Sequence, residues 1–542
     1  MAYLFRINIP NISEPFSKQD SYPTLVFQVI DGCCKNVKKR NDKYVSISCD
    51  PVTAELFEQR NRVPMMRTGR RLLISLTVAA LYISGILFAI EAALKVRTEQ
   101  GAIAWAVSLV TMPLVAVPAY LVLGRSKFEG VSDAFESRRD EFERLLGHIE
   151  KNLKPWEIPP SEGPSWHAAM VRLSNMPLTR GNHADLLING NATFDSILRG
   201  VASAEEYILF QFYMIHDDGL GQRVKAALID RARAGVRVYV LYDEIGSSGL
   251  PSRYVNDMRS AGIEVSSFKP TQGSRNQFQL NFRNHRKMVV VDGETAWVGG
   301  HNVGDEYLGL DPEFSPWRDT HVRLQGPVVI QLQMAILGDW YWATRQLPEV
   351  NWTPRPSEEH DKKAMIFPFA PTGQFETASL FFVAALNGAK ERIWLSAPYF
   401  VPDAAVMKAL QLAALRGVDV RIITTGKPDS LPVYMAAFHY MEELAGLDIR
   451  FYAYQPGFLH EKVMLIDDNV STVGTPNFDN RSFRLNFEVT SVILDREFAR
   501  EMEDMFERDF EHSKSLFPES FATRSLWWRG AVKLARLAAP VL

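Results

Sequence analysis

Apolar positions from about residue 165 onward follow an order of strand, helix and strand that occurs twice. The first copy runs through "EEYILFQFYMI" and "GLGQRVKAALIDRARAGVRVYVLYD", and the second through "KERIWLSAPYFV" and "AAVMKALQLAALRGVDVRIITTG". In each copy a glycine, Gly235 or Gly417, stands between the helix and a β-branched strand, as expected of a helix C-cap. The alternation predicts α/β units around a mixed or parallel sheet, and its repetition predicts two similar domains.

Two uncharged stretches precede this region, at residues 72–90 and 100–124. Each is close to the ~20 residues that a helix needs to cross a bilayer, although a pair of buried core helices would give the same pattern. Pro113 and Pro118 predict a kink in the second helix. Basic residues outside the pair favour a transmembrane hairpin with both ends on the cytoplasmic side; they are Arg67, Arg70 and Arg71 before it and Arg125 and Lys127 after it.

Three further segments surround the hairpin (residues 66–127) and the repeat. Residues 1–65 are polar and mixed, carry no signal-peptide pattern, and have no role that we can assign. Residues 128–165 contain a predicted connector helix whose apolar stripe is Phe135, Phe142, Leu145 and Ile149. The tail, residues 521–542, sets two tryptophans beside Arg529, Lys533 and Arg536, which is typical of a helix at a membrane interface and also compatible with a domain-packing helix.

One motif is repeated in the two halves. The stretches "RNHRKMVVVDGETAWVGGHN" and "FLHEKVMLIDDNVSTVGTPN" both fit H-x-K-x-x-x-x-D. The first match is His285, Lys287 and Asp292, and the second is His460, Lys462 and Asp467. The agreement continues beyond the motif, because Gly300 and Asn302 lie 15 and 17 residues after His285, and Thr475 and Asn477 lie 15 and 17 after His460. Two copies with matching tails indicate a duplicated unit.

Strand periodicity predicts where these groups point. "KMVVV" and "KVMLI" are strand-like and end in turn residues, so each motif predicts a β-hairpin. Histidine and lysine, two residues apart, then share one face, whereas Asp292 and Asp467 fall on the other face beside the turn, where we expect a mainly structural role. Folding each hairpin brings Asn302 and Asn477 back to their histidines. A single histidine at a strand end is usually a satisfied structural residue, but two in register argue against that alternative.

Composition narrows the chemistry. A chain of 542 residues that is 46% hydrophobic has room for two or more domains with real cores. The net charge of −3 gives no general basic field for nucleic acid. The cysteines, Cys33, Cys34 and Cys49, all precede the motifs, so the motif region has no disulfide, thiol nucleophile or cysteine metal site. This distribution is compatible with a reducing compartment.

The two motifs, each followed by G-G/T-x-N in a duplicated α/β chain, resemble the phospholipase D superfamily. Within it, "VPAYLVLGRSKFEG", "NFRNHRKMVVVDG", "PWRDTHVRLQGP", "APYFVPD" and "GTPNFDNRSFRLNFE" are similar to the bacterial cardiolipin synthases. The resemblance extends from about residue 70 to the C-terminus. It implies an α/β fold of two tandem phospholipase D-like domains with pseudo-twofold symmetry, at residues 166–355 and 356–520, preceded by the transmembrane hairpin.

The resemblance also implies roles for individual residues. His285 is expected to be the nucleophile and His460 the general acid and later base, while Lys287 and Lys462 neutralise phosphate charge without a metal ion or other cofactor. Asn302 and Asn477 are expected to bind phosphate oxygens. Asp319 in "WRDTH" and Glu488 in "NFE" are expected to orient the histidines. His301 and His321 also lie close to the motifs but match no metal-ligand spacing.

The implied activity is transfer of a phosphatidyl group between two phosphatidylglycerol molecules, which gives cardiolipin and glycerol. A phospholipase or another phosphodiesterase of the superfamily, a nuclease included, would use water instead, and a non-catalytic membrane scaffold is a third alternative. The expected partners are phospholipid substrates and the membrane, without nucleic acid. The expected location is the bacterial inner membrane, as a multi-pass protein with catalytic domains on the cytoplasmic side. A phosphatidylethanolamine donor and the oligomeric state stay open.

Overall fold

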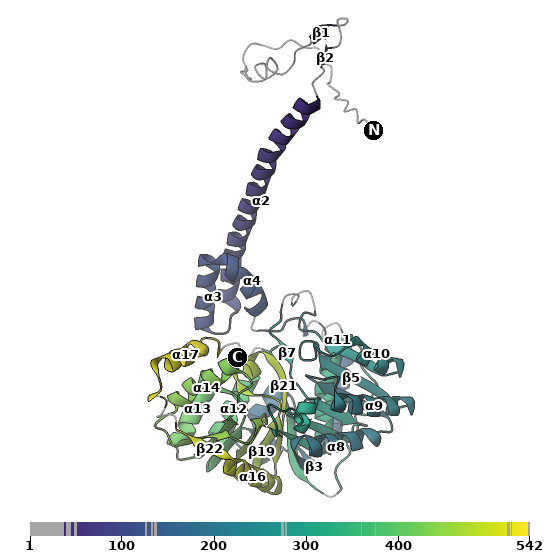
Figure 1. Cartoon of the computed structure of the whole chain (residues 1–542). Helices are drawn as coiled ribbons and strands as arrows, with labels where there is room; N and C mark the ends of the chain where they lie inside the picture. The colour runs from purple at the N-terminus through teal and green to yellow at the C-terminus, as the bar shows by residue number, and fades with distance from the viewer. Residues whose placement is uncertain are drawn as a thin grey trace. The chain divides into compact units, whose positions relative to one another are not determined.

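The structure is a computed structural model that describes residues 37–39, 45–47, 51–124, 127–131, 134, 138–272, 276, 279–358, 360–373, 375–517, 521 and 523–539, with side chains from Arg71 onward. The chain divides into two compact units, Met1–Leu87 and Phe88–Leu542. In the first unit, β1 (Val37–Lys39) and β2 (Val45–Ile47) pair antiparallel, ahead of the long helix α2 (Pro51–Lys95) (Figure 1). Most of residues 1–65 lie outside the described residues, and their role stays open.

The predicted transmembrane hairpin is only partly matched. Within the described residues, one helix is long and apolar enough to cross a membrane, Arg71–Lys95. The second predicted span is instead two short helices, α3 (Glu99–Thr111) and α4 (Pro113–Leu123). Met112 between them takes φ −134° and ψ 54°, because the residue before a proline is driven out of the helical region and Pro113 has no N–H for the helix ladder.

The loop between α2 and α3 contacts the repeated region. Arg97 Nη2 donates to the carbonyl oxygen of Gly373 at 3.1 Å, and Arg97 Nη1 lies 3.8 Å from Glu376 Oε1. Glu376 also pairs with Arg484 at 3.1 Å. A hairpin loop on the far side of a bilayer could not make these contacts, so the structure does not confirm the two-span hairpin.

The repeated region is built on one 16-stranded sheet, and the predicted α/β repeat is confirmed in its strand order. From the centre outward, one half runs β3, β11, β9, β8, β4, β5, β6 and the other β12, β21, β19, β18, β13, β15, β16, with β22 (Ser513–Leu516) at its edge. The sixteenth strand, β7 (Arg283–Asn284), lies off this path and pairs with β21. The first set is β3 (Thr179–Ile188), β4 (Tyr207–Phe212), β5 (Arg237–Asp243), β6 (Glu264–Phe268), β8 (Met288–Val291), β9 (Thr295–Gly299) and β11 (Thr320–Gln325). The second is β12 (Lys362–Phe369), β13 (Arg392–Ser396), β15 (Asp419–Thr425), β16 (Ile449–Tyr454), β18 (Val463–Ile466), β19 (Val470–Gly474) and β21 (Asn486–Leu494).

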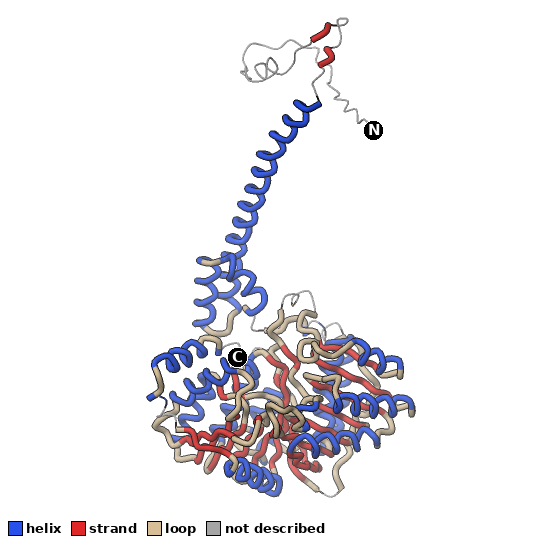
Figure 2. The backbone as a smooth tube through the Cα atoms, in the orientation of Figure 1, coloured by secondary structure: helices blue, strands red, loops and turns tan. Residues whose placement is uncertain are grey.

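Helices surround the strands of both halves (Figure 2). The first half carries α6 (Arg139–Leu153), α8 (Asn189–Ala202), α9 (Gly219–Arg233), α10 (Ser252–Ser260), η3 (Asp305–Leu308) and α11 (Val328–Thr344). Helix α7 (His167–Ser174) precedes β3 in the chain but packs on β12 and α12 of the second half. The second carries α12 (Thr377–Gly388), α13 (Ala404–Leu415), α14 (Leu431–Glu443), α15 (Asn480–Arg484), α16 (Arg496–Glu511) and α17 (Leu526–Arg536). The predicted cap residues Gly235 and Gly417 follow α9 and α13 with φ of +96° and +82°, a conformation that glycine adopts without strain.

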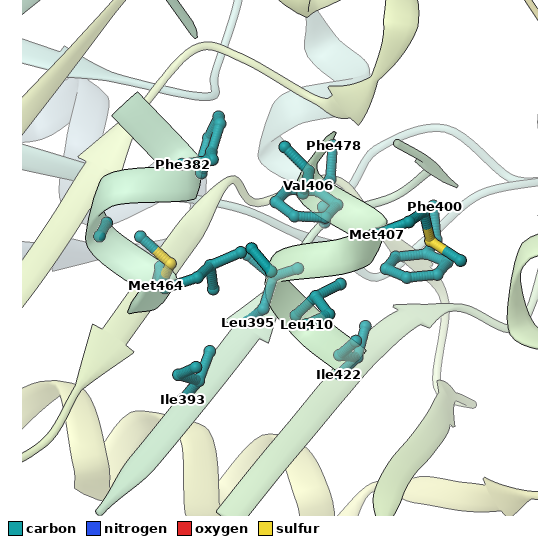
Figure 3. Close-up of a cluster of buried hydrophobic side chains, with 14 of the residues drawn as sticks. Phe382, Ile393, Leu395, Phe400, Val406, Met407, Leu410, Ile422, Met464 and Phe478 are labelled. Atoms are coloured by element: carbon teal, nitrogen blue, oxygen red, sulfur yellow. The ribbon is translucent and has the colours of Figure 1, made fainter. Parts of the chain in front are cut away.

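The core holds the two halves together as well as filling each one. Figure 3 shows the cluster of the second half, where Leu395 of β13 and Ile422 of β15 meet Leu410 of α13. A separate cluster joins Val290 of β8 to Leu465 of β18 and to residues of α11 and α16. The two motif hairpins therefore share one apolar core, which fixes them relative to each other.

The connector and the tail pack on the repeated region. Ile149 and Leu153 of α6 bury against Ile330 of α11, and the ring of Phe142 lies 4.8 Å from that of Tyr341. Phe135 of the predicted stripe lies outside the described residues. Helix α17 buries Val532, while Trp527 is 91% exposed. The tail is thus a packing helix on one side and leaves apolar side chains in solvent on the other.

Candidate active site

The two motif hairpins have the predicted register. Met288 pairs with Val298, and Val463 pairs with Val473. Continued toward the motif histidines, this register sets His285 opposite His301 and His460 opposite Pro476. The histidines leave the hairpins at the same edge of the shared sheet. Burial lowers the pKa of His460, and Lys462, Lys287 and His285 add to that shift.

Each motif histidine is held by the backbone of the other half. The short strand β7 (Arg283–Asn284) pairs in parallel with β21, and β10 (Trp317–Arg318) pairs in parallel with β17 (Phe458–Leu459). As a result, the N–H of His285 donates to the carbonyl oxygen of Phe487 at 2.9 Å, and the N–H of His460 donates to that of Arg318 at 2.8 Å. The site is therefore assembled from both repeats and cannot form in one alone.

A buried carboxylate from the opposite half accompanies each imidazole. Nδ1 of His285 lies 3.0 Å from both carboxylate oxygens of Glu488, and Nδ1 of His460 lies 2.7 Å from Asp319 Oδ2. Both carboxylates are fully buried. A carboxylate only accepts, so each Nδ1 carries the hydrogen and each Nε2 keeps its lone pair for chemistry. The structure thus places both predicted orienting residues beside their histidines.

The two carboxylates have different further partners. Glu488 also accepts from Thr475 Oγ1 at 2.6 Å and from Asn486 Nδ2 at 3.0 Å. Asp319 accepts from the backbone N–H of Thr320 at 2.8 Å. The residue at the position matching Thr475 is Gly300, where an added Cβ would lie 2.0 Å from Asp319 Oδ1. Sequence reasoning noted Thr475 only as part of the repeat and missed Asn486, whose contact depends on the fold.

Both lysines are buried beside the histidines. Lys287 is 0% exposed and Lys462 4% exposed, and each Nζ donates to the carbonyl oxygen of its own motif histidine. Burial lowers the pKa of Lys462 to about 8 and that of Lys287 well below its usual value, while the carboxylates Glu488 and Asp319 oppose the change. Two cations packed this closely create a strong site for an anion.

The ionisation of the histidines follows from the same burial. Burial lowers the pKa of His285 to about 4, against the opposing effect of Glu488, and lowers that of His460 well below its usual value. Burial alone would raise the pKa of Glu488, but His285, Lys287 and the Thr475 hydroxyl bring it down to about 2. Both imidazoles are therefore neutral near neutral pH, and a bound anion would favour the protonated form of either.

The motif aspartates lie away from the histidines. Asp292 and Asp467 occupy the hairpin turns with φ of +55° and +52°. Asp292 accepts from three successive backbone N–H groups, residues 205–207, each at 2.8 Å. Asp467 accepts in the same way from residues 390–392. Each carboxylate thus ties its hairpin to the start of the neighbouring strand, β4 or β13.

The side chains of Asn302 and Asn477 differ in the hydrogen bonds that they make within the protein. Asn302 accepts from the N–H of Met214 at 3.2 Å and donates to Tyr307 Oη at 2.6 Å. Asn477 donates its backbone N–H to Ser482 Oγ at 3.1 Å, and its Oδ1 is buried without a partner among the described residues. Its Nδ2, the group that could donate to a phosphate oxygen, has no partner among the described residues either, so Asn477 is the more available of the two for an anionic ligand.

Buried arginines behind the motifs reveal an unequal arrangement in the two halves. In the first half, Arg286 donates to Asp339 of α11 at 2.8 Å. In the second, Asp509 occupies the equivalent place on α16, but its partner is Arg318, at 2.8 Å. Arg318 also lies 2.9 Å from the carboxylate of Glu461, the residue between His460 and Lys462. Sequence reasoning missed these ion pairs because their partners come from distant elements.

The second half therefore buries two carboxylates against one arginine. Burial raises the pKa of Glu461 to about 7, with Arg318 opposing and Asp509 adding to the shift. Arg318 is also the residue whose carbonyl oxygen accepts from His460, and it directly precedes Asp319. The network thus supports the backbone that positions His460.

The remaining histidines and acids near the site do not join it. His301 and His321 face each other with their Nδ1 atoms 3.0 Å apart, and burial lowers the pKa of each to about 3. In the part of the chain that the structure describes, one group has the spacing of a metal site, His216, Asp218 and Glu306. Asp218 caps α9 and Glu306 lies 3.3 Å from His216 Nδ1, so these groups already serve one another and the backbone.

Comparison with known proteins gives consistent relatives. A family model described as "Cardiolipin synthase, PLD-like domain" matches residues 197–315 and 382–510. "Cardiolipin synthase A" of Pseudomonas fluorescens (strain SBW25) is 46% identical over 476 residues, covering 87% of this chain and 98% of that protein. The protein of the same name from Pseudomonas aeruginosa (strain LESB58) is 45% identical over 86% of this chain and 96% of its own length.

A solved structure shares the fold. The phosphatidylserine synthase of Haemophilus influenzae Rd KW20 superposes with a TM-score of 0.52 at 13% identity, covering 69% of this chain and 99% of that one. At that identity the likeness concerns the fold alone.

Proposed function

The chain belongs to the cardiolipin synthase family of phospholipase D-like proteins, and we propose on this premise that it transfers a phosphatidyl group from one phosphatidylglycerol to another, giving cardiolipin and glycerol. The observation that carries the proposal is the pair of imidazoles, each oriented through Nδ1 by a buried carboxylate of the opposite half. This arrangement supplies two separate Nε2 atoms, one for attack and one for proton transfer.

In the first step, the lone pair of His285 Nε2 attacks the phosphorus of the donor lipid. The bond from phosphorus to the glycerol headgroup oxygen breaks, and protonated His460 gives its Nε2 proton to that oxygen. The products are a phosphatidyl-histidine and free glycerol. The phosphate charge and Asp319 both favour the protonated state that His460 needs.

In the second step, the glycerol hydroxyl of another phosphatidylglycerol attacks the same phosphorus. Its proton passes to His460 Nε2, the oxygen–phosphorus bond forms, and the nitrogen–phosphorus bond to His285 breaks. Cardiolipin leaves, and both histidines are back in their starting states. Lys287, Lys462 and Asn477 stabilise the phosphate oxygens during both steps, with Asn302 holding the neighbouring backbone.

Product analysis tests this function against hydrolysis. Purified protein in phosphatidylglycerol vesicles is expected to form cardiolipin and glycerol in equal amounts, with little phosphatidic acid. Phosphatidic acid as the main lipid product would mean that water is the acceptor, and the protein would then be a phospholipase. No lipid turnover under any condition would contradict both activities.

We further propose that the protein acts at the bacterial inner membrane, attached through Arg71–Lys95 and the apolar helices α3 and α4. The charge pattern supports catalytic halves on the cytoplasmic side. In a variant whose Cys33, Cys34 and Cys49 are replaced by serine, a membrane-impermeant thiol reagent should leave Leu415→Cys unlabelled in intact cells; labelling without lysis would contradict this orientation.

A further inference from the structure

The proposed reaction brings two phosphodiesters into one site. The buried lysines face the phosphate that is transferred, but the acceptor lipid carries a phosphate of its own, one glycerol unit away from the attacking hydroxyl. Two anions this close repel each other strongly in a partly dehydrated site. A transferase that uses an anionic lipid as acceptor therefore needs a second cationic subsite, which a hydrolase does not.

Arg283 lies where such a subsite is needed. It precedes His285 by two residues in an extended stretch, so it shares the side of His285 at roughly 7 Å along the strand, comparable to a three-carbon bridge between two phosphates. Its Nη1 donates to the carbonyl oxygens of Phe282, at 2.8 Å, and Leu280. Among the described residues, no carboxylate forms an ion pair with Arg283, and its side chain is partly exposed.

A second guanidinium from the other half lies beside it. Arg481 of α15 donates through Nη2 to the carbonyl oxygen of Asn281 at 2.6 Å and through Nη1 to Asn281 Oδ1 at 3.3 Å. The two arginines thus bind carbonyl oxygens of the three successive residues 280–282. Their proximity adds to burial in lowering the pKa of Arg481.

Tyr213 links the two arginines to the motif histidine. Its ring lies 4.9 Å from the imidazole of His285. Burial raises the pKa of the Tyr213 hydroxyl and Asp243 adds to that shift, while Arg283 and Arg481 oppose it. The arginine pair therefore borders the His285 side of the site.

This cationic pair has no counterpart in the other half. The residue two positions before His460 is Phe458, whose ring packs 4.8 Å from that of Trp317. The residue four positions after Asn302, which matches Arg481 after Asn477, is Glu306. The pseudo-twofold site is thus cationic on one side and aromatic and acidic on the other. Two substrates with the same headgroup would then bind in two different ways.

The segment that carries Arg283 also contacts the apolar helices. Gln279 Nε2 donates to the carbonyl oxygen of Leu121 in α4 at 2.8 Å. On α4, Leu114 and Val115 are 59% and 65% exposed, as expected of a surface that meets lipid. The arginine pair is therefore connected to the part of the protein from which a second lipid headgroup would arrive.

We propose that Arg283 and Arg481 bind the phosphodiester of the acceptor phosphatidylglycerol while its glycerol hydroxyl reaches the phosphatidyl-histidine. This inference rests on the proposed function and extends it, because it assigns the residues that select an anionic lipid over water or a small alcohol as the acceptor. The bidentate donors of a guanidinium suit a phosphodiester.

The experiment compares two reactions of the same purified full-length enzyme. One is cardiolipin formation in phosphatidylglycerol vesicles. The other is exchange of labelled free glycerol into phosphatidylglycerol, which uses the same histidines but an acceptor without a phosphate. In Arg283→Gln and Arg481→Gln, cardiolipin formation should fall about tenfold or more, the effect of losing a charge-assisted hydrogen bond, while exchange stays within about twofold. Retained exchange also shows that the variants fold.

Two further variants sharpen the result. Arg283→Lys keeps the charge and should recover part of the cardiolipin activity. Arg253→Gln changes an exposed arginine on α10 and should leave both reactions unchanged. Raising the phosphatidylglycerol fraction of the vesicles should partly restore Arg283→Gln, since the loss is one of acceptor binding.

Three outcomes would overturn the proposal. An equal loss of exchange and cardiolipin formation would mean that the arginines serve the donor or the fold. Unchanged cardiolipin formation in both variants would mean that the acceptor phosphate binds elsewhere. A wild-type enzyme that exchanges glycerol but makes no cardiolipin would refute the proposed function itself, and the acceptor subsite with it.

Discussion

His285 and His460 occupy matching positions in the repeat but have different neighbours. The carboxylate beside His285 is shared with Thr475 and Asn486, whereas Asp319 bonds to His460 and one backbone N–H. A carboxylate that accepts more hydrogen bonds is a weaker partner for an imidazolium. The two histidines thus have different surroundings, and the roles proposed above, attack by His285 and proton transfer by His460, rest on the family resemblance.

Glu488→Gln tests the contact by which Glu488 orients His285. An amide cannot hold His285 in the same tautomer as firmly, so turnover should fall by about 10-fold to 100-fold with little change in melting temperature. The remaining activity should also shift with pH. Burial lowers the pKa of His285 to about 4, and Glu488 opposes that shift. Loss of the Glu488 carboxylate should therefore lower this pKa further and move the acid limb of kcat/KM to lower pH. Thr475→Val is the milder control; an unshifted limb in Glu488→Gln would contradict the assignment.

The residues of the site divide by how the chain brings them together. The motif histidines and lysines, together with Asp319 and Glu488, could be predicted, because a repeated spacing and a family resemblance single them out. Asn486, Arg318 and Asp509 could not, because their contacts join elements from distant parts of the sequence. The parity of a strand was enough to separate Asp292 and Asp467 from the histidines, but it could not show which backbone groups they would bind.

Among the helices, α11 and α16 hold matching positions in the two halves, but the arginine that pairs with each comes from a different segment. Asp339 binds Arg286 from the first motif, whereas Asp509 binds Arg318 from across the domain boundary. The exchange leaves Glu461 as an additional buried carboxyl. Both halves thus have a buried aspartate on the helix, Asp339 or Asp509, but the arginine that pairs with it comes from a different position in each half. The second half therefore has one more buried carboxyl group, Glu461, that can bind a proton.

Glu461→Gln should change how stability depends on pH. The pKa of Glu461 is about 7 in the folded protein against an ordinary value of 4.5, so the folded state binds this proton more tightly. The resulting stabilisation is complete below about pH 4.5 and is lost as the pH rises through about 7, amounting to at most about 3 kcal/mol. The groups that face Glu461 are Arg318, Asp509, Thr320, Ser396 and Tyr454.

Melting temperatures between pH 5 and pH 8 measure this contribution. The wild-type protein should lose stability over that range relative to Glu461→Gln, whose amide does not titrate. Glu507→Gln, an exposed change on α16, should keep the wild-type slope. Identical slopes in wild type and Glu461→Gln would contradict the raised pKa.

The turn aspartates lead to the opposite expectation for activity. Asp292→Ala or Asp467→Ala removes a carboxylate that accepts from three backbone N–H groups, so each should lower the free energy of unfolding by about 1–3 kcal/mol. Both side chains lie away from the histidines, so kcat per folded molecule should stay near the wild-type value. Chemical denaturation with parallel activity assays checks this, and a large loss of kcat at unchanged stability would give these aspartates a chemical role.

The two apolar stretches before the repeat show what a hydropathy pattern could not predict. Hydropathy and length predicted two spans, and the first is a continuous helix. The second stretch has the same composition, but Pro113 breaks it into α3 and α4. The contact from Arg97 to Gly373 then depends on tertiary packing, which a hydropathy pattern does not contain.

At the scale of the whole repeated region, one continuous sheet carries a site made from both halves, and apolar helices adjoin it. Exposed apolar side chains gather on α3 and α4, among them Ile103, Val107, Leu114 and Val115. This exposed surface suits contact with lipid acyl chains, and such contact would bring the substrate headgroups near the site.

Leu114→Asp combined with Val115→Asp tests the role of that surface. A charged pair should weaken contact with the bilayer, so activity on phosphatidylglycerol vesicles should fall about tenfold while activity on detergent-dispersed lipid is kept. Leu415→Asp changes an exposed leucine at the end of α13, which is also a short apolar helix, and serves as the matched control. Equal losses in vesicles and detergent would mean that the change damages the fold instead.

The proposed mechanism is a covalent relay through two histidines of opposite halves, and trapping the covalent adduct tests it. Enzyme mixed with phosphatidylglycerol labelled in its phosphate is quenched in alkali, which preserves a phosphorus–nitrogen bond, and is then digested for mass spectrometry. The label should appear on the peptide that contains His285 and be absent from His285→Ala. Label on His460 would reverse the two roles, and cardiolipin formation by an enzyme that never carries label would contradict the relay.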